Sequence, residues 1–102
     1  MWIVSRKMLV QHGTQQPSLM GALDHWYRIA KRVEWLSIKD VRRDFPHADC
    51  VVVASGGVVT IFNIGGNKCR LITSIHYNTG KVFVLRVLSH ATYTRGNWKG
   101  KL

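Results

Sequence analysis

The two halves of the chain differ in how apolar and polar positions alternate. Before residue 49 the apolar side chains recur at helical spacing, most clearly at five positions that would share one face of a helix over residues 19–34: Leu19, Leu23, Trp26, Ala30 and Val33. After residue 49, runs rich in Val and Ile are separated by short turns that contain Gly and Asn. The pattern predicts helices in the first half and a sheet in the second.

Serine residues mark where the predicted helices begin. The apolar stretch MWIVS is predicted to form a short strand that stops at Ser5, and this serine would cap a helix that starts with RKMLVQH. Ser18 would cap the second helix in the same way. Ser37, with an aspartate three residues later, resembles the capping box of a short third helix, which Pro46 ends.

Four strands and a last helix are predicted in the second half. The strands are CVVVA, VVTIFNI, CRLITSIHY and KVFVLRVLS, at residues 50–54, 58–64, 69–77 and 81–89. Such short turns join antiparallel neighbours, and a short helix from His90 to Arg95 would follow. The expected fold is α+β, in one domain over residues 1–102. An N-terminal strand, a helical hairpin and a short helix would pack with a mainly antiparallel sheet, with a short C-terminal helix.

The charge is strongly positive and unevenly distributed. The chain carries a net charge of +10, and all five acidic residues lie within residues 24–49. Such a surface attracts polyanions or an acidic protein. Because no carboxylate follows Asp49, the cationic half offers no ligands for Mg²⁺, which argues against a two-metal nuclease, and we predict no metal site and no cofactor.

The cysteines and the hydropathy indicate a cytoplasmic protein. Cys50 and Cys69 lack metal-ligand or redox-motif spacing, so we expect both to be reduced and packed in the interior. No stretch resembles a signal peptide, and no apolar run is long enough to span a bilayer.

The alternation of side chains in the last two strands predicts a cationic groove. Arg70 shares a strand face with Ile72, Ser74 and His76, a set too polar to be expected in the core. If helices cover the face formed by Phe83, Leu85 and Val87, Arg70 and Arg86 emerge together on the open side, with Lys68 at the turn. Arg86 could equally have a structural role instead of binding phosphate. His76 could equally serve strand packing or function.

His90 and Tyr93 are the candidate proton-transfer residues. They are three positions apart after the last strand, so one helical turn would place an imidazole and a phenol side by side. A site of Arg, Lys, His and Tyr suits cleavage of RNA, whose own 2′-hydroxyl can attack the adjacent phosphorus. Arginine would stabilise the developing charge, and histidine and tyrosine would move protons.

The C-terminal residues form a basic tail with one tryptophan. Gly96 and Gly100 are expected to leave this tail mobile, and its cations Arg95, Lys99 and Lys101 would follow an RNA surface. Trp98 would either stack on a base or anchor the tail to the sheet. Anchoring is the interpretation that we favour.

Several segments, in order along the chain, resemble the HigB toxins of bacterial toxin–antitoxin modules, a branch of the RelE-like mRNA interferases. They are MWIVSRKML, WYRIAKRVEW, FPHAD, FNIGGNKCRLITSIHY and KVFVLRVLSHATYTRGNW. The resemblance implies a small cytoplasmic endoribonuclease that cleaves mRNA on the translating ribosome and leaves a 2′,3′-cyclic phosphate. It also implies a helix-turn-helix, HigA-like antitoxin as partner.

The resemblance assigns roles to individual residues. Arg70, His90, Tyr93 and Lys68 are the catalytic residues that it implies, with Arg70 on the phosphate and His90 as general acid or base. The residues expected to bind RNA or the ribosome are Asn67, Arg86, Arg95, Trp98, Lys99 and Lys101. Two other functions stay open, a non-catalytic RNA-binding or ribosome-binding module and a gyrase-type inhibitor on the same fold.

Overall fold

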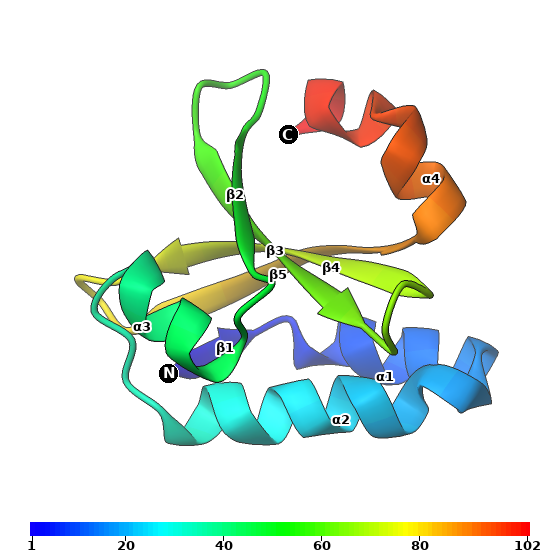
Figure 1. Cartoon of the computed structure of the whole chain (residues 1–102), viewed down its shortest axis with the longest axis horizontal. Coiled ribbons are helices and arrows are strands. Elements are labelled where there is room, and N and C mark those ends of the chain that lie inside the picture. The colour runs from blue at the N-terminus through cyan, green and yellow to red at the C-terminus, as the bar shows by residue number, and fades with distance from the viewer.

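The computed structural model describes all residues, Met1–Leu102, and has the predicted order of elements (Figure 1). They are β1 (Trp2–Val4), α1 (Arg6–Gln15), α2 (Pro17–Arg32), α3 (Ile38–Asp44), β2 (Asp49–Val52), β3 (Val58–Ile64), β4 (Cys69–His76), β5 (Lys81–Ser89), α4 (His90–Arg95) and the 3-10 helix η1 (Asn97–Lys101). The α+β class and the meander are confirmed. None of the helices is long and apolar enough to cross a membrane.

Of the three serines predicted as helix caps, Ser5 and Ser37 do occupy the N-cap positions, but neither side chain makes a capping hydrogen bond. Ser5 precedes α1 with a positive φ of 70°, and its side chain makes no capping hydrogen bond. Ser18 lies inside α2, which begins at Pro17, where the missing N–H would be unpaired in any helix. Ser37 does precede α3, but the carboxylate of Asp40 instead accepts a hydrogen bond from the backbone N–H one residue before this serine, at 2.9 Å.

The sheet has five strands in the order β1-β5-β4-β3-β2. β2 to β5 pair as antiparallel neighbours, whereas β1 lies parallel to the first part of β5, from Lys81 to Phe83. α1 and α2 lie side by side along one face of the sheet, and α4 follows β5 on the other side of the molecule (Figure 1). The sheet is therefore mixed, with one short parallel pair at its edge.

A β-bulge in β5 resets which side chains face the helices. Ile72 pairs with Arg86 and Thr73 pairs with Val84, so Leu85 is an extra residue without a partner. An extra residue on one strand shifts the alternation of the residues that follow it. The predicted faces of β5 are consequently correct only after the bulge.

Before the bulge the predicted faces are reversed. Val82 and Val84 are buried in the cluster beneath the helices, whereas Phe83 lies on the other face, with its ring centroid 4.9 Å from that of His76. Leu85 also packs away from the helices, and of the three residues predicted to be covered only Val87 is. His76 is exposed, and its ring packs against a side chain of the neighbouring strand, which agrees with the strand-packing interpretation.

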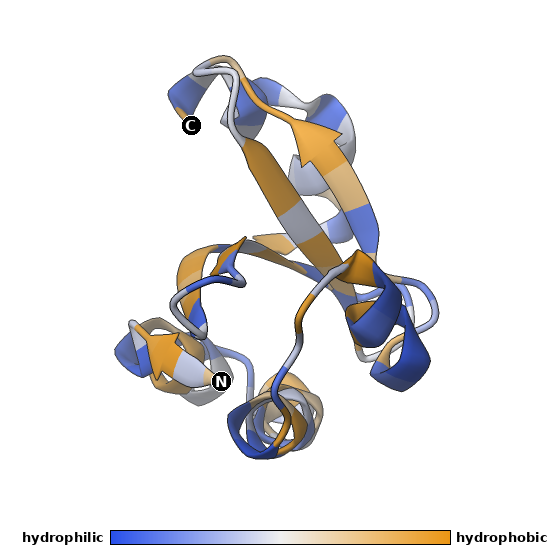
Figure 2. Ribbon diagram, turned by 90° about the vertical axis from the view of Figure 1, so that its left-hand side faces the viewer, coloured by the Kyte–Doolittle hydropathy of each residue, from blue (hydrophilic) through white to orange (hydrophobic).

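Two apolar clusters lie on opposite faces of the sheet (Figure 2). The larger one, beneath α1, α2 and α3, centres on Phe62, whose ring contacts Trp26, Trp35 and Phe45 at centroid distances of 5.3, 6.0 and 5.2 Å. The smaller one lies beneath the C-terminal segment and consists of Val53, Val59, Ile61, Ile72 and Trp98. The burial of Ile72 in this second core contradicts the expectation that its strand face stays outside the core.

Candidate active site

The β3–β4 turn and the end of β5 meet at one end of the sheet. Gly65 and Gly66 have φ of 62° and 71°, a conformation that glycine adopts without steric cost, and they reverse the chain just before Lys68. The carbonyl oxygen of Lys68 accepts a hydrogen bond of 3.3 Å from the backbone N–H of His90. The turn residues and the first residue of α4 are thus neighbours, as the predicted site requires.

Arg70 lies beneath this junction and is only 8% exposed. Its guanidinium donates one hydrogen bond to the carbonyl oxygen of Cys69, at 3.3 Å, and one to the side-chain oxygen of Asn67, at 3.2 Å. The Tyr93 ring lies against it, with 5.5 Å between the guanidinium carbon and the ring centroid. Arg70 does share a face with Arg86, as predicted, but it is buried beside Tyr93 of α4 instead of emerging from the sheet.

No carboxylate neutralises the buried Arg70. The two ion pairs of the molecule, Arg28 with Asp24 and Arg43 with Asp40, lie on the helices. Burying an unpaired charge is costly, and a guanidinium has five N–H donors, of which neutral oxygens here engage two. The remaining donors and the uncompensated charge suit an anion.

The α4 helix carries His90 and Tyr93 one turn apart, on the same side of the helix. The Ser89 hydroxyl accepts a hydrogen bond of 3.2 Å from the backbone N–H of Thr92, which caps the helix directly after β5. His90 is therefore the first residue of α4 and is exposed, while Tyr93 follows one turn later and is half-buried.

Trp98 fixes the position of Tyr93. The two rings stack at a centroid distance of 5.4 Å, and the indole N–H donates to the Tyr93 carbonyl oxygen at 3.1 Å. The tail is further attached where the Ala54 backbone N–H donates to the Lys99 carbonyl oxygen, at 3.1 Å. Trp98 is buried, so its predicted anchoring role is confirmed, and the tail expected to be mobile is a 3-10 helix packed on the sheet.

Three of the four remaining predicted cations form a second group. Arg86, Arg95 and Lys101 line a cavity of about 250 Å³ together with Thr92 and Asn97, two polar residues that were not among the predicted site residues. Arg86 also donates to the carbonyl oxygen of Leu85 at 2.7 Å, which supports its structural interpretation as well. Lys99 lies elsewhere, its ammonium 5.8 Å from the centroid of the Trp98 ring.

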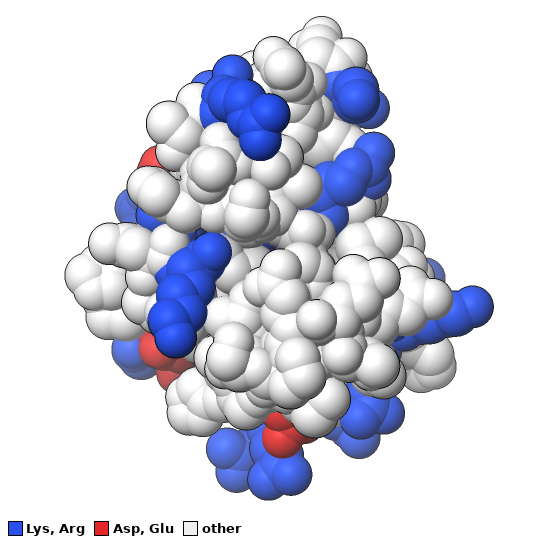
Figure 3. Space-filling view, turned by 90° about the vertical axis from the view of Figure 1, so that its right-hand side faces the viewer, with Lys and Arg blue, Asp and Glu red and all other residues white.

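Positive charge dominates this side of the molecule. In Figure 3, Lys and Arg side chains are scattered over the whole of this side between uncharged ones, and the few acidic side chains visible lie toward the left and lower margins. Nine of the ten predicted site residues fall into two groups, and Lys99 belongs to neither. The first group is the cluster of Asn67, Lys68, Arg70, His90 and Tyr93, and the second is the cavity lined by Arg86, Arg95, Trp98 and Lys101.

The two cysteines have different environments. Cys69 is buried, and this burial raises the pKa of its thiol to about 11, against the opposing effect of the Arg70 charge. Cys50 is exposed, because β2 is an edge strand, so the expectation that both thiols are packed is wrong for Cys50. No group of three or more His, Cys, Asp or Glu side chains could hold a metal ion.

The fold and this site define a small α+β protein with a cationic cluster on the sheet face opposite its helical hairpin. Residues 20–96 match the model of the HigB_toxin family, described as the RelE-like toxic component of a toxin–antitoxin system. The chain therefore belongs to the HigB toxin family, which confirms the resemblance. It is similar to the mRNA interferase HigB of Escherichia coli O6:H1 (strain CFT073), with 26% identity over 95 residues that cover 93% of this chain and 90% of that protein.

Proposed function

We propose that this toxin is an endoribonuclease, an mRNA interferase that cleaves mRNA on the translating ribosome in the cytoplasm, within a single domain over residues 1–102. The observation that carries the proposal is the buried Arg70, which has no carboxylate partner and lies against Tyr93, one helical turn after His90. The E. coli relative named mRNA interferase supports the same activity.

The proposed reaction uses the substrate's own nucleophile. The 2′-oxygen attacks the adjacent phosphorus, the bond from phosphorus to the 5′-oxygen breaks, and the products carry a 2′,3′-cyclic phosphate and a 5′-hydroxyl. His90 and Tyr93 carry out the two proton transfers, removal of the 2′-hydroxyl proton and protonation of the leaving 5′-oxygen. Arg70, assisted by Lys68, stabilises the charge that develops on the phosphoryl oxygens.

The other cations would hold the RNA beside this site. Asn67 orients Arg70 through its hydrogen bond, and the cavity of Arg86, Arg95 and Lys101 offers three positive charges for neighbouring phosphates. Lys99 and Trp98 complete the proposed RNA and ribosome surface, where Trp98 acts by positioning Tyr93. Membership in a toxin–antitoxin family implies an antitoxin, for which we propose a helix-turn-helix, HigA-like protein.

Analysis of the RNA ends tests this proposal. Purified protein is incubated with mRNA, with and without ribosomes, and the new ends are mapped. We expect cyclic phosphate ends, and no cleavage where a 2′-deoxynucleotide replaces the nucleotide before the scissile bond. Binding without cleavage would identify a non-catalytic module, and inhibition of gyrase with intact RNA would identify a topoisomerase inhibitor.

A second experiment tests the proposed absence of a metal from the reaction. Free RNA replaces ribosomes, because EDTA damages ribosomes themselves. Cleavage of this RNA is expected to persist in EDTA, since Arg70, His90 and Tyr93 supply charge stabilisation and proton transfer without a cation. Loss of cleavage that Mg²⁺ restores, with RNA structure held constant, would contradict the mechanism.

A further inference from the structure

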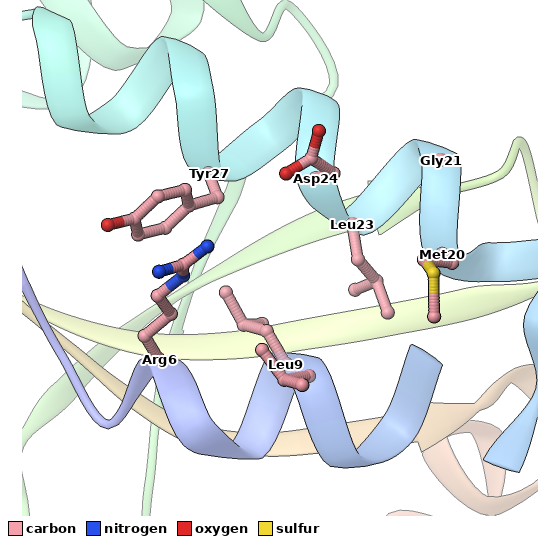
Figure 4. A pocket seen from close by; sticks show the side chains of 8 residues that line it. Arg6, Leu9, Met20, Gly21, Leu23, Asp24 and Tyr27 are labelled. Carbon is pink, nitrogen blue, oxygen red and sulfur yellow. The ribbon is translucent and has the colours of Figure 1, made fainter. Parts of the chain in front are cut away.

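A groove of about 340 Å³ runs along the seam between α1 and α2, on the side of the molecule away from α4 (Figures 1 and 4). Leu9 and Leu23 form its buried floor. Val10 and Met20 stand at its rim and are 53% and 47% exposed. The seam therefore exposes apolar side chains that the packing of the two helices does not cover.

Gly21 lines this groove in the interior of α2 (Figure 4). A Cβ atom at this position would meet nothing within 4 Å, so the packing of the chain itself does not require a glycine. By contrast, a Cβ at Gly13 would lie 3.4 Å from the Cα of Met20, so the close approach of α1 and α2 explains that glycine. Glycine destabilises a helix when it lies in the interior of that helix. Because Gly21 has no side chain, another molecule can approach the helix backbone closely at this point.

One end of the groove is cationic. The guanidinium carbon of Arg6 lies 4.4 Å from the centroid of the Tyr27 ring (Figure 4). The Lys31 ammonium lies 5.8 Å from the centroid of the same ring. The acid in the lining, Asp24, is paired with Arg28 at 2.8 Å. Arg6 and Lys31 therefore have no carboxylate partner within the molecule.

The apolar surface continues beyond this cationic end. Trp2, which is 72% exposed, lies in an adjoining hollow that also contains Arg6, Tyr27 and Lys31. Apolar positions at Trp2, Val10 and Met20 thus follow the seam with two cations between them. An exposed apolar strip of this kind is typical of a protein–protein interface.

We propose that the α1–α2 groove binds an acidic amphipathic helix of the antitoxin, with an apolar side chain of that helix against Gly21 and carboxylates beside Arg6 and Lys31. The unpaired cations call for carboxylates or phosphates, and the apolar lining favours a protein over RNA. A second copy of this chain is disfavoured, because two copies would bring the same cations together. The proposal depends on membership in the toxin–antitoxin family and is independent of the proposed RNA cleavage.

The test measures antitoxin binding and RNA cleavage on the same set of variants. The toxin is co-expressed with the protein encoded by the adjacent reading frame, and the affinity of the purified pair is measured by titration calorimetry. We expect Gly21→Trp, which fills the groove, and the double change Arg6→Glu with Lys31→Glu each to weaken binding at least about tenfold, the effect of a central interface residue. Gly57→Trp, in the β2–β3 turn, is the matched control and should bind normally.

Two further readouts separate loss of the interface from loss of the fold. Gly21→Ala should raise the melting temperature, because alanine favours the helix, and should still weaken binding. Mapped cleavage of mRNA on ribosomes should be unchanged in every groove variant. The proposal is overturned if the adjacent protein does not bind the unmodified chain, if Gly21→Trp binds it normally, or if the groove variants lose RNA affinity instead of protein affinity.

Discussion

The sheet has one face beneath α1 and α2 and another beneath α4 and η1. Both faces bury side chains of β3 to β5, but they serve different purposes. The first face holds an apolar cluster of 14 buried residues centred on Phe62. The second holds five buried apolar residues and, at its border, the buried Arg70. The larger cluster supplies most of the burial that stabilises the fold, and the smaller one positions charged and aromatic side chains.

The difference shows how this chain accommodates an unfavourable charge. A buried arginine without a carboxylate lowers stability, and small domains are only marginally stable. Because the two clusters share strands, the helix-covered core can offset the cost of a charge on the opposite face. Changes on the two faces should therefore separate stability from activity.

The largest effect on activity without loss of stability is expected at the proposed catalytic residues. His90→Ala should reduce single-turnover RNA cleavage about 10²–10⁴-fold, the usual contribution of a general acid or base, and Arg70→Ala about 10²–10³-fold or more. Both variants should fold, since His90 is exposed and removal of Arg70 removes a buried charge. Both should also relieve the growth arrest that the unmodified toxin causes. Arg28→Ala on α2 is the control, and full activity in folded Arg70 and His90 variants would refute the site.

Loss of either aromatic anchor should lower stability, but by different amounts and with different effects on cleavage. Phe62→Ala is expected to lower the free energy of unfolding by about 3–5 kcal/mol, because it empties the centre of the main core. Trp98→Ala should cost less, about 3 kcal/mol or below, because its cluster is smaller and can collapse. It should nevertheless reduce cleavage, since Tyr93 loses its stacking partner. Urea unfolding and cleavage rates check both values, and equal losses of stability would contradict the difference between the faces.

A smaller effect is expected from the tail charges. Neutralising Arg95, Lys99 and Lys101 with glutamine should weaken ribosome binding and lower the slope of log K against log[salt] by about two units, at roughly 0.7 per phosphate contact. Cleavage at saturating ribosome should stay near that of the unmodified chain. The matched control neutralises three cations of the helical face, Lys7, Lys31 and Arg32. If both triple variants behave alike, the tail is not a preferred RNA surface.

The smallest effect concerns the thiol beneath the helices. Because burial raises the pKa of Cys69 to about 11, from an ordinary value near 9, the unfolded chain ionises at a pH where the folded one does not. This contribution leaves stability unchanged below pH 9 and lowers it as the pH rises from 9 to 11. Urea unfolding at several pH values should show this loss in the unmodified protein and less of it in Cys69→Ala. At pH 8.5 a thiol reagent should label Cys50 and leave Cys69 unlabelled until the chain unfolds.

Local sequence was sufficient for the type and order of the elements, and it selected residues that the structure brings together at the proposed site. Periodicity and turn residues predicted the bounds of β3, β5 and α4 correctly, because strand and helix spacing is a property of short segments. His90 and Tyr93 were selected by their spacing and by the family resemblance, and they do lie on one helical turn. Short motifs also carried the resemblance to the HigB toxins, which the match of residues 20–96 to the family model confirmed.

The tertiary structure decided what each of these residues faces. The bulge at Leu85 depends on how β5 pairs with β4, so no alternation within β5 could reveal that Phe83 and Val84 exchange faces. Arg70 is buried because the C-terminal segment, anchored by Trp98, returns to cover a strand face that looks too polar for a core. Burial and side-chain orientation arise from contacts between distant segments, whereas sequence patterns record only the preferences of neighbouring residues.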